Sequence, residues 1–172
     1  MIRELRHIHA FLEVARRGSF TRAAAELPTD RELTYHHLIT DRLCAFAVPD
    51  HPLVRKKTAT LRDLVTYPLI LLVKESSVRD IFERALVKEG LKISVAHEAI
   101  YMSTALGMAH AGLGVAVLPE SALQVASPRA LRIVPVSSPA LTRKIGIIGK
   151  PGRSLSPAAV KRVDVLRQLA RH

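Results

Sequence analysis

Apolar residues near the N-terminus recur at helical spacing. An amphipathic helix is predicted by the stripe formed by Leu5, Ile8, Leu12 and Ala15. Gly18 ends that pattern, and a short second helix is predicted over Thr21–Leu27, with Ser19 or Thr21 as its cap. Two such helices joined by a tight turn form the first part of a helix-turn-helix, although the same spacing fits any helical hairpin.

From Arg42 onward, short apolar runs alternate with helical segments. The runs predicted to be strands are Leu43–Val48, Leu69–Val73, Ile93–Val95, Val115–Leu118, Leu131–Val134 and Lys144–Ile148. The predicted helices are Val78–Glu89 capped by Ser76 and Ser77, one capped by Ser103 and ending near Gly112, and one opened by Ser156 and Pro157. This alternation predicts an α/β layer with mainly parallel strands, which binds ligands beyond the carboxyl ends of its strands.

The net charge of +11 is compatible with binding to nucleic acid, because clustered Lys and Arg displace counterions from phosphate. Its distribution weakens that interpretation, since residues 1–30 carry five basic and four acidic side chains. Residues 141–172 carry eight basic side chains and one acidic one, Asp164. A solvated basic helix face explains this C-terminal concentration at least as well as a DNA-binding surface does.

The composition fits one ordinary domain with a small additional segment, because 48% of the 172 residues are hydrophobic. The single cysteine, Cys44, lies in an apolar run and is predicted to be a buried thiol rather than a reactive one. The sequence shows no export signal and no apolar stretch long enough to cross a membrane. We therefore expect a cytoplasmic protein that has no membrane partner.

Residues suited to catalysis or metal binding form no recognisable pattern. Gly112 and Gly114 precede a predicted strand instead of opening a helix, so they do not fit a dinucleotide-binding fingerprint. The eight histidines show no ligand spacing with cysteine or carboxylate. No serine lies in a nucleophile-elbow pattern, and no pair of acid and base stands out. We therefore expect no enzymatic activity, no metal and no cofactor.

A specific motif lies within the predicted helix-turn-helix. Residues 18–27 read Gly-Ser-Phe-Thr-Arg-Ala-Ala-Ala-Glu-Leu, and the segment Leu12–Leu27 resembles the opening of the winged helix-turn-helix in LysR-type transcriptional regulators. The later segments that resemble the second regulatory subdomain of that family are Asp41–Leu43, Val48–Leu53, Leu61–Leu64, Tyr67–Leu71 and Ala111–Pro119. The last of them is similar to a Gly-x-Gly-x-x-x-Leu-Pro pattern of the family.

The resemblance implies an α/β fold in three parts. Residues 1–30 would form a partial winged helix-turn-helix of two helices, 31–40 a junction, and 41–172 an effector lobe like that of periplasmic binding proteins. The lobe would be mainly the second regulatory subdomain, with 142–172 returning to an incomplete first one. The last helix would then lack the part of the first subdomain that usually covers its apolar face. That face, formed by Val160, Val163, Leu166 and Leu169, would either pack on the remaining lobe in another way or drive self-association.

The departure from the family lies between Leu27 and Asp41. In the family, a recognition helix, a wing, a linker helix and most of the first regulatory subdomain occupy this place, and here the residues are too few to encode them. The recognition helix reads base edges in the major groove. DNA binding, for which Ser19, Thr21 and Arg22 are the candidate residues, is therefore expected to be lost or severely weakened.

The effector site of the family lies between its two regulatory subdomains. By position, the wall from the second subdomain corresponds to residues 73–78, which are Val73, Lys74, Glu75, Ser76, Ser77 and Val78. A second patch lies at Met102, Ser103 and Thr104. Backbone N–H groups at a helix start, together with serine hydroxyls, suit a carboxylate or another anion. The alternative interpretation is that Ser76 and Ser77 simply cap their helix.

Two functions fit these observations. The first is a LysR-type DNA-binding transcriptional regulator that responds to a small-molecule effector and is impaired by the missing block. The alternative is a stand-alone small-molecule-binding lobe without specific DNA binding. The absence of a catalytic pattern argues against an enzyme, and the absence of an export signal argues against an exported solute binder.

Overall fold

The computed structural model describes residues 34–124, 130–149 and 156–169. The chain divides into two compact units, one formed by Asp41–Arg143 and the other by Met1–Thr40 with Lys144–His172. The helix-turn-helix predicted within residues 1–30 lies outside the described residues. Within the described ranges, no helix is both long and apolar enough to cross a membrane.

Strands and helices alternate along most of the described chain. In order, the elements are β1 (Thr34–Ala47), η1 (Pro52–Arg55), α3 (Leu61–Leu64), β2 (Leu69–Leu72), α4 (Ser77–Lys88), β3 (Val95–Ala99), α5 (Met102–His110), β4 (Val115–Pro119), η2 (Glu120–Gln124), β5 (Arg132–Pro135), β6 (Thr142–Gly149) and α6 (Pro157–Leu169). The predicted α/β class is therefore confirmed for the described part of the chain.

The strands form one mixed sheet in the order β3-β2-β4-β1-β5, and β6 pairs with β1. Strand β2 runs parallel to both β3 and β4, whereas β1 is antiparallel to β4 and β5. The prediction of mainly parallel strands is wrong for the part of the sheet around β1. Apolar runs identify buried strands, but they do not encode strand direction.

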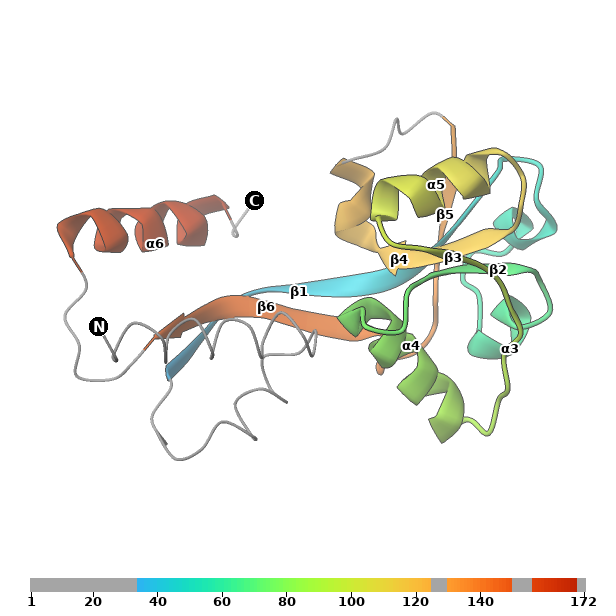
Figure 1. Ribbon diagram of the computed structural model, residues 1–172, viewed down its shortest axis with the longest axis horizontal. Coiled ribbons are helices and arrows are strands. Elements are labelled where there is room, and N and C mark those ends of the chain that lie inside the picture. Colours follow the sequence, from blue (N-terminus) through green and yellow to red (C-terminus); the bar gives the residue numbers. More distant parts are fainter. Residues whose placement is uncertain (1–33, 125–129, 150–155, 170–172) are drawn as a thin grey trace. The chain divides into compact units, whose positions relative to one another are not determined.

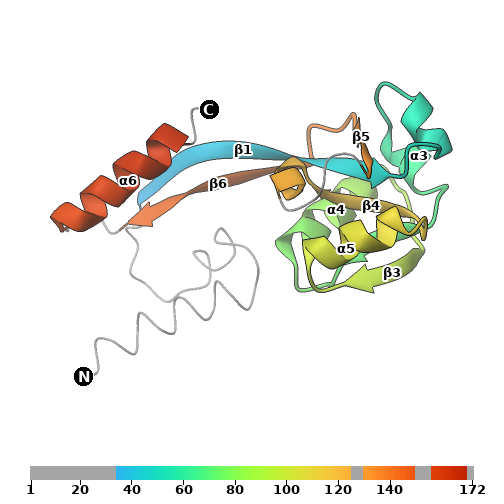
Figure 2. The same ribbon diagram turned by 90° about the horizontal axis from the view of Figure 1, so that it is seen from above.

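Helices cover both faces of the parallel strands. Figure 1 and Figure 2 show α5 on one face of these strands and α4 on the other. Every residue of β2 and β4 is buried, and Phe46 of β1 and Phe82 of α4 are fully buried in the same core. The continuous apolar runs read from the sequence are those expected of strands covered on both faces.

Several predicted bounds differ from the structure. Strand β1 begins at Thr34 rather than at Leu43, so residues 34–40 of the predicted junction belong to a strand. Strand β3 occupies Val95–Ala99 rather than Ile93–Val95, because its pairing with β2 extends to Ala99 opposite Leu72. The polar residues in β3 hid this edge strand from the apolar pattern. Helix α5 begins at Met102, so Ser103 lies in its first turn and is not its cap.

The residues at the two ends of the unit Asp41–Arg143 are joined by a buried ion pair. Asp41 is 6% exposed, and its Oδ2 accepts hydrogen bonds from Nε and Nη2 of Arg143 at 3.0 and 2.8 Å. The same carboxylate also accepts from the Ser121 hydroxyl at 2.7 Å and from its backbone N–H at 3.3 Å. Both oxygens of this buried carboxylate therefore accept hydrogen bonds, as its burial requires.

Cys44 is buried in β1 and free, which confirms the predicted buried thiol. Burial raises its pKa to about 11, and the nearby carboxylates of Glu120 and Asp41 add to the shift. A thiol attacks electrophiles as the thiolate, so Cys44 is unreactive at neutral pH.

The apolar side chains of α6 remain partly exposed. Of the four residues predicted to lack cover, Val160 and Leu166 are 45% and 46% exposed, Val163 is half-buried, and the side chain of Leu169 lies outside the described part. The neighbouring Val165 is 47% exposed. Ser156 begins this helix as predicted, because its Oγ accepts the Ala159 N–H at 3.3 Å. Exposure of this helix is one of the two outcomes expected for a helix that lacks its usual cover, and self-association through it stays a prediction.

Gly114 is required by the close approach of two backbones before β4. Its φ is +151°, and a Cβ at this position would lie 2.3 Å from the Pro68 carbonyl oxygen. That carbonyl accepts the Val115 N–H at 2.9 Å and so joins the start of β4 to the start of β2. A side chain would have to displace this hydrogen-bonded backbone.

We expect Gly114→Ala to lower the free energy of unfolding by at least about 2 kcal/mol, because it combines a strained φ with a backbone clash. The matched control is Gly107→Ala in α5, where an added Cβ meets nothing within 4 Å. Alanine is the better helix former, so the control should raise stability by about 0.5–1 kcal/mol. Urea denaturation measures both, and equal effects of the two substitutions would contradict this account.

Candidate functional site

The carboxyl ends of β2 and β3 lie side by side at one edge of the sheet. Leu72 pairs with Ala99, and the Val73 N–H donates to the Ala99 carbonyl at 3.1 Å. The segments that follow these strands, residues 73–77 and 100–104, therefore begin at neighbouring points. We call this region the carboxyl edge. It contains both patches that the sequence singled out as effector candidates.

The first segment is a turn that leads into α4. The Ser76 N–H donates to the Val73 carbonyl at 2.9 Å, and Ser76 Oγ accepts the Val78 N–H at 3.3 Å. Ser76 is thus the N-cap of α4, which agrees with the alternative interpretation that this serine caps its helix. The Ser77 hydroxyl, in contrast, makes no hydrogen bond with any described residue and is only half-buried.

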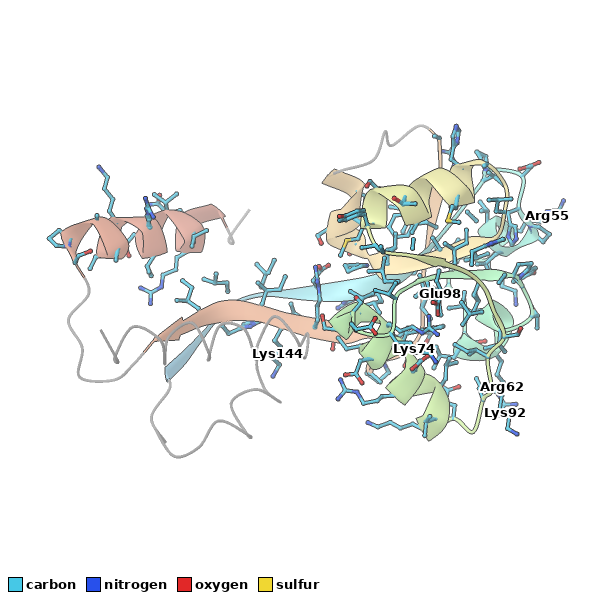
Figure 3. All side chains as sticks on the ribbon, in the orientation of Figure 1. Arg55, Arg62, Lys74, Lys92, Glu98 and Lys144 are labelled. Carbon is cyan, nitrogen blue, oxygen red and sulfur yellow. The ribbon has the colours of Figure 1, made fainter. Side chains whose placement is uncertain are left out.

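The remaining candidates in the first segment differ in exposure. Lys74, marked in Figure 3, is exposed and forms no ion pair with a described residue. Val73 is half-buried, while Val78 is only 3% exposed and belongs to the hydrophobic core. Lys74, Glu75 and Ser77 are therefore the side chains of this segment whose polar atoms make no interaction with a described residue, and Lys74 and Ser77 are the two that can donate to an anion.

The second segment opens α5. Tyr101 occupies the N-cap position without a side-chain capping hydrogen bond. Ser103 and Thr104 are exposed in the first turn, and Met102 is half-buried against the core. The first N–H groups of α5 are therefore not capped by a side chain, and helix N-termini of this kind attract anions.

Two exposed apolar residues at the carboxyl edge were not predicted. Ile100 and Tyr101 are 69% and 67% exposed, although they directly follow the buried Ala99. In the sequence they lie between the predicted strand Ile93–Val95 and the helix predicted to be capped by Ser103. Only the structure shows that the chain turns outward after Ala99 and presents both side chains beside the start of α5.

A buried arginine beneath the carboxyl edge was also missed. Arg79, in the first turn of α4, is only 3% exposed, and its Nη1 donates to the Leu72 carbonyl at 3.0 Å. The same Nη1 donates to Glu98 Oε1 at 3.2 Å, and Nε donates to Glu83 Oε1 at 2.6 Å. The spacing of Arg79 and Glu83 by four residues was the one visible sign, and it suggests an ordinary surface pair.

The carboxyl edge can bind a small anion with an apolar part. Lys74 supplies a cation, while Ser77, Ser103 and the first turn of α5 supply donors. Among the described residues, no group of three or more His, Cys, Asp or Glu side chains could hold a metal ion. The candidate DNA-contacting residues, Ser19, Thr21 and Arg22, lie outside the described residues.

The sequence matches the family model for the LysR substrate binding domain over residues 20–171. It is 30% identical over 131 residues to the uncharacterized HTH-type transcriptional regulator YbhD of Escherichia coli, which covers 76% of this chain and 41% of YbhD. It is also 30% identical over 134 residues to the transcriptional dual regulator GltC of Bacillus subtilis, covering 77% of this chain and 45% of GltC. The chain therefore spans less than half the length of these curated relatives, which are transcriptional regulators and not enzymes.

Solved structures show the same fold. The regulatory domain of CcmR from Synechocystis, in complex with 2-PG, matches with a TM-score of 0.72 at 21% identity over 86% of this chain and 71% of that one. The effector binding domain of BenM with its effector benzoate matches with a TM-score of 0.69 at 21% identity over 84% and 66%. The effector binding domain of QuiR in complex with shikimate gives 0.67 at 16% identity over 84% and 68%.

Ser76 and Ser77 are separable by mutation. We expect Ser76→Ala to lower the free energy of unfolding by about 1 kcal/mol, because it removes the cap of α4. Ser77→Ala should change stability by less than about 0.5 kcal/mol, since its hydroxyl has no hydrogen bond to lose. Urea denaturation of the two variants measures the difference, and a larger loss for Ser77→Ala would show that the cap is assigned to the wrong serine.

Proposed function

Since the chain belongs to the LysR substrate binding domain family, we propose that it is the effector-binding part of a LysR-type transcriptional regulator. The observation that carries the proposal is the carboxyl edge, where two strand ends and two helix starts converge. The Val73–Ala99 hydrogen bond of 3.1 Å brings the two candidate segments together. Ligands of α/β folds bind in this location, beyond the carboxyl ends of parallel strands.

The proposed effector is a small carboxylate or another small anion. Val73, Lys74, Ser76, Ser77 and Val78 form the first contact segment, and Met102, Ser103 and Thr104 form the second. Lys74 and the Ser77 hydroxyl are free to bind an anion, whereas Ser76 and Val78 shape the segment through the cap and the core. Structurally similar domains are described with shikimate, benzoate and 2-PG, which supports a small polar effector.

We further propose that the protein binds DNA more weakly and less specifically than a complete LysR-type regulator. Ser19, Thr21 and Arg22 would contact DNA, but specific readout of base edges requires a recognition helix. Residues 28–40 are too few to supply that helix together with a wing and a linker helix. The protein would act in the cytoplasm, with self-association through the partly exposed face of α6.

Small carboxylates should stabilise the protein against heat. Benzoate or shikimate at a hundredfold excess over its dissociation constant contributes about 2.7 kcal/mol, a rise in Tm of several degrees. Lys74→Gln should weaken binding about tenfold, because it removes a charge-assisted hydrogen bond. The control is Lys92→Gln, an exposed lysine just before β3 and therefore at the opposite edge of the sheet (Figure 3).

Differential scanning fluorimetry measures the rise in Tm, and calorimetric titration measures the dissociation constants of the wild-type protein and the two variants. Equal weakening by the Lys74 and Lys92 substitutions would mean that only net charge attracts the ligand. If no small carboxylate or phosphate raised the Tm of the wild-type protein, the carboxyl edge would not be an effector site.

DNA binding should be weak, steeply salt-dependent and without sequence preference. The measurement is fluorescence anisotropy across a salt series, comparing a duplex selected from a random pool with its scrambled version. Replacing Lys161 and Arg162 of α6 by Gln should reduce affinity for both duplexes alike if phosphate attraction dominates. A preference for the selected duplex by about 10³ or more would contradict a weakened DNA-binding segment.

A further inference from the structure

Arg79 is an unusual residue for the place that it occupies. It lies in the first turn of α4, where the helix dipole disfavours a positive charge, and it is only 3% exposed. Burying an isolated charge is costly, so the guanidinium requires compensation. Glu83 Oε1 at 2.6 Å and Glu98 Oε1 at 3.2 Å supply the opposite charges.

The bonds of Arg79 join three elements at one point. The side chain starts on α4 and reaches the last carbonyl of β2 at 3.0 Å, and its Nη1 also contacts Glu98 of β3. Leu72 directly precedes the first candidate segment, and Glu98 lies two residues before Ile100. A single guanidinium nitrogen of Arg79 therefore bridges β2 and β3 directly before the points where the two segments of the carboxyl edge begin.

Strand β3 depends on such a bridge more than the other strands do. Among the described strands, it lies at the end of the sheet and pairs with β2 alone. Ala96 and Glu98 are exposed, and Ala99 is the one residue of this strand that is buried in the core, so little apolar burial holds β3 in place. The contact of Glu98 with a guanidinium that is fixed in the core gives this edge strand a second anchor beside its backbone ladder.

We propose that Arg79 is a positioning residue for the effector site, acting through Glu98 to hold the ends of β2 and β3 against the start of α4. The inference rests on the proposed function, since it explains how that site keeps its shape. A buried ion pair is a weak source of net stability, because desolvation offsets most of its attraction. Its geometric effect is to hold α4, β2 and β3 in a fixed arrangement, and an effector site requires such a fixed arrangement of the segments that contact the ligand.

The test uses Glu98 instead of Arg79, because removing the buried guanidinium would disturb folding itself. Glu98 is 47% exposed, so Glu98→Ala leaves a folded protein. Amide hydrogen exchange is measured on the full chain without ligand. In Glu98→Ala, exchange at the hydrogen-bonded amides of Val73, Ser76 and Ala105 should accelerate about tenfold, the factor expected when a hydrogen bond to a charged group is lost.

Three comparisons define the result. Exchange in β4 and in the core of β1 should stay unchanged, because the effect is local. Glu98→Gln, which keeps an oxygen acceptor for Nη1, should restore part of the protection. The matched control is Glu89→Ala, at the end of α4, because Glu89 is exposed and its side chain has no ion pair with a described residue. Unchanged exchange in Glu98→Ala, or acceleration spread evenly over the chain, would overturn the proposal.

The change in benzoate affinity caused by Glu98→Ala distinguishes a positioning role from a purely electrostatic one, because the two roles predict changes of opposite sign. Removing a carboxylate near an anion site should by itself tighten the binding of benzoate, whereas loss of positioning should weaken it several-fold. Weaker binding by Glu98→Ala supports the proposal, and tighter or unchanged binding overturns it. If wild-type protein binds no benzoate, the proposed function fails for that ligand, while the exchange experiment still decides the role of Arg79.

Discussion

The carboxylate of Asp41 is the constraint on which the unit Asp41–Arg143 depends. It bonds to Arg143, 102 residues later, and to Ser121, 80 residues later, so one buried group joins β1, η2 and β6. The adjacent backbone bond from the Leu43 N–H to the Leu141 carbonyl, at 2.9 Å, closes the same loop. Closing a long loop costs conformational entropy, and charge-assisted hydrogen bonds in a buried setting offset that cost. With its ends held, the intervening chain can form a sheet whose edge carries the candidate site.

The candidate site follows from how the buried strands end. Strands β2 and β4 are apolar throughout because α4 and α5 cover them, so polar groups appear only where the chain leaves the sheet. At the carboxyl edge, the lost ladder bonds are replaced by the cap of Ser76 and by the contacts of Arg79. Donors that remain unused there, such as Ser77 and the first turn of α5, are available to a ligand.

Sequence reasoning predicted the α/β class, most strands, the bounds of α4 to within one residue and the buried Cys44, because each depends on local apolar patterning. It failed where the determining contact is distant. Arg79 and Glu98 are 19 residues apart, and nothing in either neighbourhood marks them as partners. Ile100 and Tyr101 belonged to no predicted element, and the bounds of β3 were misplaced because an edge strand needs few apolar side chains. The helix-turn-helix, the domain limits and the contact residues of the effector remain predictions.

The buried Cys44 has a practical consequence. With a pKa of about 11, only about one molecule in ten thousand carries its thiolate at pH 7. It is also the only cysteine among the 172 residues. The folded chain therefore behaves towards thiol reagents as though it had no cysteine, and a second cysteine placed on its surface would accept a fluorophore or spin label at that position alone.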